Sequence, residues 1–138
     1  MKIILTLAML FAATQSALAE MVTATGAFHG GNHAPGDTAK GGVTVVKLDS
    51  GLYELRLGDD FSTTPGPDLF VYLSVSPDPQ NDSAIAKNAF FNIGKLASPQ
   101  GLQKFALPKD FDPTKFRSVA VWCKSYGVLF GAAAFAAQ

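Results

Sequence analysis

Turn-forming residues interrupt this chain so often that no long helix fits between them. Clusters of Gly, Pro, Asn and Asp recur along residues 20–138, and the stretches between them are short and rich in β-branched and aromatic residues. No long stretch keeps the spacing of apolar side chains that marks an amphipathic helix. Short β-rich stretches bounded by turns are typical of antiparallel sheets. The sequence therefore predicts an all-β fold.

The stretches between the turns give the candidate strands. They span residues 22–28, 37–48, 52–57, 69–75, 88–96, 103–107, 118–123 and 128–135. In the stretch 52–57 apolar and polar residues alternate, which indicates a strand with one face toward water. The stretch 69–75 is apolar on both faces, so we expect a central strand there. About eight short, mainly antiparallel strands predict a single-domain β-sandwich or flattened barrel.

The connections between these strands are predicted from their turn residues. Pro and Gly are dense in residues 59–68, so we expect a loop there. Residues 76–87 are polar with two prolines, so we expect an exposed loop. Residues 124–127 are expected to close a hairpin. Residues 110–115 are expected to form one helical turn capped by an aspartate. The pair Gly41–Gly42 predicts a bulge or a sharp bend.

The start of the chain has the three-part pattern of a secretory signal. Lys2 gives a positive start, residues 3–13 form an apolar run, and Ala17-Leu18-Ala19 is a small-residue cleavage site. We expect the signal to be cut between Ala19 and Glu20. This pattern predicts a periplasmic or secreted protein.

Removal of the signal, residues 1–19, leaves residues 20–138, a length that suits one domain with its own core. No later apolar run approaches the roughly 20 residues that cross a bilayer, so no integral membrane segment is expected after cleavage. The whole chain has 11 basic and 11 acidic side chains. They are scattered, without the basic cluster that nucleic-acid binding requires. Composition therefore predicts a soluble exported domain that binds no nucleic acid.

Cys123 is the only cysteine of the chain, although exported proteins usually pair their cysteines in disulfides. Four interpretations stay open: a buried inert thiol, an intermolecular bridge, a redox thiol, or a ligand to a metal or haem. Alternation along the strand places Cys123 on one face with Val121, and this face has the composition of a core. Its position at the strand end, next to Lys124, instead favours a reachable sulfur and a thiolate.

Two histidines and the aromatic residues are candidate neighbours of this sulfur. His29 and His33 lie in or beside the Gly-rich segment 30–36, and neutral imidazole binds haem iron, zinc and copper. His33 is the better candidate, because Pro35-Gly36 would fix the loop around it. Trp122 and the phenylalanines are numerous enough to line a haem-sized pocket, but a small β-core holds the same residue types.

Several cofactor motifs are missing from the sequence. There is no C-x-x-C-H for covalent haem and no C-x-x-C for a dithiol. Nothing after Cys123 is His or Met, so a blue-copper site is not expected. Asp59, Asp60 and Asp68 crowd one loop, and we assign them to turn hydrogen bonds rather than to catalysis or Ca²⁺ binding.

Several short motifs follow one another in a recognisable order. They are Gly26-x-Phe28, Gly66-Pro67-Asp68-Leu69, Gly94-Lys95-Leu96, Gly101-x-Gln103-x-Phe105 and Val121-Trp122-Cys123-Lys124. In this order they closely resemble the DM-13 electron-transfer domain family, over essentially the whole chain after the signal. The Gly-Pro-Asp-Leu and Trp-Cys elements make the resemblance specific.

The resemblance implies a small all-β exported domain that takes part in redox reactions. The family's redox role centres on its cysteine, as a naked thiol or as the ligand of a prosthetic group such as haem, and this role carries onto Cys123. We expect Trp122 and the hairpin end to shape the site and His33 to complete it. A redox partner protein is then expected, and an electron-transfer or binding domain fits better than a stand-alone enzyme. The cofactor and the oligomeric state stay open.

Two other hypotheses compete with this redox role. In one, the protein is a non-catalytic binding module of the cell envelope, and Cys123 is a buried structural residue. In the other, Cys123 forms an intermolecular disulfide, which predicts a dimer that a reductant separates. A thiol that reacts with a labelling reagent only after denaturation favours the binding module.

Overall fold

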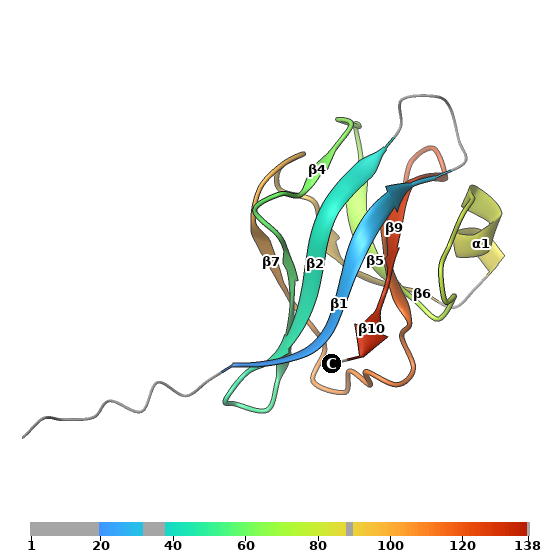
Figure 1. The fold of residues 1–138 in the computed structure, drawn as a ribbon. Helices are drawn as coiled ribbons and strands as arrows, with labels where there is room; N and C mark the ends of the chain where they lie inside the picture. Colours follow the sequence, from blue (N-terminus) through green and yellow to red (C-terminus); the bar gives the residue numbers. More distant parts are fainter. Residues whose placement is uncertain (1–19, 32–37, 88–89, 138) are drawn as a thin grey trace, which may run out of the picture.

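The computed structural model describes residues 20–31, 38–87 and 90–137 (Figure 1). Within these residues the chain forms ten strands and one short helix. In chain order they are β1 (Met21–Gly30), β2 (Ala39–Lys47), β3 (Tyr53–Leu57), β4 (Ser62–Thr63), β5 (Leu69–Ser74), α1 (Asp82–Lys87), β6 (Phe90–Lys95), β7 (Gln103–Ala106), β8 (Ser118–Cys123), β9 (Val128–Ala134) and β10 (Ala136–Ala137). The predicted all-β fold is confirmed.

One continuous antiparallel sheet makes up the molecule. Its strand order is β6-β5-β8-β9-β1-β2-β3-β7, and the two-residue strands β4 and β10 pair with β2 and β1. The sheet curls until its edge strands β6 and β7 come into contact, which makes a nearly closed barrel (Figure 1). Closing a sheet in this way protects its two edges. The prediction of a β-sandwich or flattened barrel of short antiparallel strands is confirmed, and the structure has the barrel form.

The interior of the barrel is the main hydrophobic core. Leu55 and Leu57 of β3 are fully buried, as the alternation in that stretch predicted. Val119, Val121 and Cys123 of β8 point into the same core, because alternate residues of a strand share a face. Burial of each such aliphatic side chain contributes about 1.5–3 kcal/mol.

A second, smaller cluster covers the outer face of β5 and β8, and we call it the outer aromatic cluster. Its members are Phe70, Tyr72, Ile85, Ala120, Trp122, Leu129 and Ala132. Helix α1 covers part of it, since Ile85 is fully buried. The side-chain oxygen of Asp82 accepts a hydrogen bond from the backbone N–H of Leu129 at 2.7 Å, which fastens α1 to β9. Strand β5 is therefore buried on both faces, as predicted for a central strand.

The prediction of an exposed loop over residues 76–87 is wrong for the second half of this segment, where α1 forms. Asn81 caps the helix, because its side-chain oxygen accepts a hydrogen bond from the backbone N–H of Ala84 at 3.0 Å. Ile85 then packs on the outer aromatic cluster. A helix of six residues has too few apolar positions to show a helical period in the sequence. No helix within the described residues is long and apolar enough to cross a membrane.

One of the predicted connections differs in detail from the structure, and a predicted bend coincides with a change of strand partner. Residues 110–115 form turns and no helix, although Asp112 does cap them by accepting a hydrogen bond from the Thr114 backbone N–H at 2.8 Å. Strand β2 changes its partner from β3 to β4 at the pair Gly41–Gly42, where a bend was predicted. Gly41 has a φ of +101°, and a Cβ there would lie 2.5 Å from the carbonyl oxygen of Asp60.

Candidate functional site

Cys123 is the last residue of β8 and lies between two neighbouring strands. Its cross-strand partners are Leu69 of β5 and Val128 of β9. Both Leu69 and Cys123 belong to the main core, and Cys123 is only 2% exposed. The thiol is therefore packed among apolar side chains, even though the strand ends at this residue.

Backbone hydrogen bonds hold the strand end that carries Cys123. The N–H of Gly127 donates to the carbonyl oxygen of Cys123 at 2.9 Å, and the N–H of Lys124 donates to the carbonyl oxygen of Asp68 at 3.0 Å. The Asp68 carboxylate accepts a hydrogen bond from the Ser125 hydroxyl. The two motifs that make the family resemblance specific, Gly-Pro-Asp-Leu and Trp-Cys, are thus neighbours in the fold.

Trp122 lies on the opposite face of β8 from Cys123. Its indole is 8% exposed and belongs to the outer aromatic cluster, with its ring centroid 6.3 Å from that of Tyr72. The ammonium of Lys124 lies 5.4 Å from the centroid of the Phe70 ring, and Phe70 is the cross-strand partner of Trp122. Lys124 therefore extends over the Trp122 face of the sheet and not into the core that holds the thiol.

His29 is the one imidazole that the structure describes, since His33 lies outside the described residues. Nε2 of His29 lies 2.5 Å from a carboxylate oxygen of Asp78, and Nδ1 lies 2.9 Å from the carbonyl oxygen of Gly30. Both of these neighbours are acceptors and favour a doubly protonated ring, whereas the Gln80 side-chain nitrogen, 3.4 Å from Nε2, is a donor. Partial burial lowers the pKa of His29, but the hydrogen bonds to Gly30 and Asp78 outweigh it and raise that pKa.

The His29–Asp78 pair attaches the segment before α1 to the end of β1. Sequence reasoning missed it, because 49 residues separate the partners and no local pattern links them. The pair holds Asp78, which precedes α1, against β1, and a partly exposed pair of this kind contributes about 1 kcal/mol or less to stability. These contacts give His29 a structural role.

Two aspartates of loop 59–68 bind segments outside their own loop. Besides the contact of Asp68 with Ser125, the Asp60 carboxylate accepts a hydrogen bond at 2.9 Å from the backbone N–H of Gly42, which lies in β2, 18 residues away. Within the described part of the chain, no three His, Cys, Asp or Glu side chains gather in a way that could hold a metal ion.

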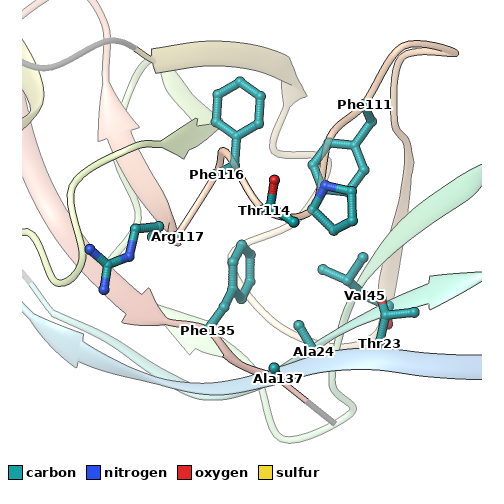
Figure 2. Close-up of a pocket in the computed structure, with 10 residues that line it drawn as sticks. Thr23, Ala24, Val45, Phe111, Thr114, Phe116, Arg117, Phe135 and Ala137 are labelled. Atoms are coloured by element: carbon teal, nitrogen blue, oxygen red, sulfur yellow. The ribbon is translucent and has the colours of Figure 1, made fainter.

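A separate hollow of about 200 Å³ lies where β8 begins, at the far end of this strand from Cys123. Three phenyl rings surround it, from Phe111, Phe116 and Phe135 (Figure 2). Phe111 and Phe116 are stacked, with ring centroids 6.0 Å apart. Arg117 lines the rim, and its guanidinium points away from the three rings (Figure 2). This hollow contains none of the residues that the sequence singled out.

Fold and site together define a small, nearly closed antiparallel β-barrel with a single, buried thiol at one strand end. Residues 28–135 match the model of the family described as electron transfer DM13. The match covers most of the chain, and the protein belongs to this family. The family's name points to electron transfer. Neither the curated proteins nor the solved structures include a match to this chain.

Proposed function

We propose that the protein is an exported electron-transfer domain whose redox residue is Cys123. Membership of the electron transfer DM13 family supports the electron-transfer role, and the signal pattern of residues 1–19 supports export. One observation carries the assignment to Cys123. The matched span holds a single thiol, and this thiol lies at the end of β8 beside the Gly-Pro-Asp-Leu segment.

Burial of the thiol restricts the chemistry that it can perform. Thiol–disulfide exchange requires direct attack of one sulfur on another, and a side chain that is 2% exposed does not permit that approach. Electron transfer requires no such contact, because electrons tunnel across packed atoms. In the proposed reaction the Cys123 thiol gives one electron to a one-electron oxidant and releases its proton to water at the strand end. A one-electron reductant reverses the step.

The surroundings of Cys123 do not fit a haem as they stand. Its side chain packs in the main core, and its cross-strand neighbours Leu69 and Val128 lie directly against it. An iron ligated by Sγ would need space that these side chains fill. The proposal therefore uses the naked thiol and derives no step through a prosthetic group.

Voltammetry of the mature protein tests the assignment. The unaltered protein is expected to give a redox wave that Cys123→Ala abolishes. Val121→Ala is the matched control, because Val121 points into the same core from the same strand and carries no sulfur. We expect this variant to keep the wave. A folded Cys123→Ala protein with an undiminished wave would contradict the proposal, and circular dichroism establishes that each variant is folded.

The burial of Cys123 also favours a second candidate function, a binding module of the cell envelope with a structural cysteine. Under this alternative the unaltered protein gives no Cys123-dependent wave, and Cys123→Ala changes stability only. The absorption spectrum of the purified protein adds an independent check, because a stoichiometric visible chromophore would indicate a bound prosthetic group and would contradict both the naked-thiol reaction and the plain binding module.

A further inference from the structure

We propose that Tyr72 and Trp122 form an electron relay between Cys123 and the surface of the barrel. The inference rests on the proposed function, since it supplies the route by which a buried thiol exchanges electrons. Phenol, indole and thiol are the protein side-chain groups that most readily lose a single electron. The structure places one of each in a row across the paired strands β5 and β8: Tyr72 on β5, then Trp122 and Cys123 on β8.

Tyr72 lies between Trp122 and an exposed ring at the edge of the sheet. Its ring centroid is 6.3 Å from that of Trp122 and 4.8 Å from that of Phe90, on which it stacks with an angle of 4° between the ring planes. Tyr72 and Trp122 are 3% and 8% exposed, whereas Phe90 is 46% exposed. The two oxidisable rings are thus shielded from water, and the ring stacked on Tyr72 reaches the solvent.

The inner end of the relay is the covalent link between Trp122 and Cys123. The two residues are consecutive in β8, with the indole on the outer face and the thiol on the inner face. One peptide unit therefore bridges the outer aromatic cluster and the main core. An electron that crosses it passes through bonds and needs no opening of the barrel.

Oxidation of a phenol also releases its proton. Burial, and then the negative charge of Asp68, raise the pKa of Tyr72, so the phenol keeps its proton in the resting state. Asp68 directly precedes β5, on which Tyr72 lies.

The relay oxidises Cys123 in three successive electron transfers. An external one-electron oxidant, a metal complex or a metalloprotein, removes an electron from Tyr72, and the phenolic proton passes to solvent, which 3% of the Tyr72 surface still reaches. Trp122 returns an electron to the tyrosyl radical, which recovers a proton from solvent. Cys123 then returns an electron to the Trp122 radical cation and releases its own proton to water. In the net reaction Cys123 loses one electron and one proton, and both rings are restored.

Photo-oxidation of the mature protein tests the relay. Tyr126→Phe serves as the background, because Tyr126 is 74% exposed and would be oxidised directly. A photoexcited ruthenium polypyridyl complex with a cobalt(III) ammine as the final acceptor supplies the oxidising equivalent. Transient absorption follows the tyrosyl and tryptophanyl radicals. The matched control is Tyr53→Phe, since the Tyr53 ring packs on Phe111, away from the outer aromatic cluster.

In this background Tyr72→Phe is expected to abolish the tyrosyl radical. Trp122→Phe is expected to prolong the lifetime of the tyrosyl radical, because it interrupts the path from Cys123. Tyr53→Phe is expected to change neither the yield nor the lifetime of this radical. A tyrosyl radical that survives Tyr72→Phe but not Tyr53→Phe overturns the relay. Electron paramagnetic resonance of the background protein identifies the oxidised tyrosine by its side-chain torsion, so the proposal can be tested even if Trp122→Phe does not fold.

Voltammetry separates failure of the relay from failure of the proposed function. A Cys123-dependent wave that keeps its rate in both Trp122→Phe and Tyr72→Phe overturns the relay and leaves the proposed function intact. A wave that does not depend on Cys123 overturns the proposed function. Slower electron transfer to Cys123 in both ring variants supports the relay.

Discussion

Trp122 and Cys123 are consecutive residues of β8, yet their side chains belong to two different hydrophobic clusters on opposite faces of the sheet. Trp122 packs outside the barrel with Tyr72, and Cys123 packs inside it next to Leu69. The Trp-Cys element therefore joins the two apolar layers of the protein at one point. This arrangement lets the single thiol stay in the core while remaining one residue away from the aromatic rings near the surface.

Serine in place of Cys123 is expected to destabilise the protein more than alanine does. Cys123→Ala removes one packed sulfur and lowers the free energy of unfolding by about 1 kcal/mol. Cys123→Ser keeps the size but buries a hydroxyl among apolar side chains, which costs about 1–3 kcal/mol when the hydroxyl finds no partner. Urea denaturation measures both values, with the exposed Tyr126→Phe as the control. Equal stability of the serine variant and the unaltered protein would show that the buried hydroxyl finds a hydrogen-bond partner.

The His29–Asp78 pair is expected to make stability depend on pH. The pKa of His29 is raised in the folded protein, so the contribution of the pair is complete below the unfolded pKa of about 6.5 and is lost as the pH rises through the folded pKa. The difference in melting temperature between the unaltered protein and Asp78→Asn should therefore be larger at about pH 5.5 than at about pH 8.5. Both groups are partly exposed, so the effect is small and weakens with salt. A difference that grows with pH would contradict the assignment.

The hydrogen bond from Leu129 to Asp82 is expected to hold α1 on the barrel. Asp82→Ala leaves the backbone N–H of Leu129 without this acceptor and should lower the free energy of unfolding by about 1 kcal/mol. Hydrogen exchange of the Leu129 amide should become faster in the same variant. Asp82→Asn is the matched control, because it keeps a side-chain oxygen at this position and should recover most of the protection. An unchanged exchange rate of the Leu129 amide in Asp82→Ala would show that this hydrogen bond does not hold α1 on the barrel.

Gly41 and Gly51 give a matched pair of glycines, both with positive φ. A Cβ at Gly51 meets nothing within 4 Å, so Gly51→Ala costs only the backbone strain of about 1–3 kcal/mol. A Cβ at Gly41 would lie 2.5 Å from the carbonyl oxygen of Asp60, so Gly41→Ala must also displace the loop. Thermal denaturation should show a clearly lower melting temperature for Gly41→Ala. Equal melting temperatures of the two variants would mean that the loop containing Asp60 moves to accommodate the new Cβ without loss of stability.

Local patterns were sufficient to predict most of the strands. The alternation in residues 52–57 marked the buried face of β3, and the doubly apolar stretch 69–75 marked β5 as central, because both patterns reflect which faces a strand must bury. Helix α1 escaped prediction for a physical reason. Its six residues are stabilised by the contact of Ile85 with the outer aromatic cluster and by the hydrogen bond of Asp82 to β9, and both partners are distant in sequence.

The sequence by itself determined the all-β class, the hairpin of β8 and β9 and the single thiol. It also assigned alternate residues of β8 to opposite faces, because a strand has a two-residue period. Only the tertiary structure decided that Cys123 is packed among core side chains, that Lys124 lies over Phe70, and that Asp78 binds His29. Each of these depends on strands or loops far apart in the chain. The curvature of the sheet brings them together, and no local pattern encodes that curvature.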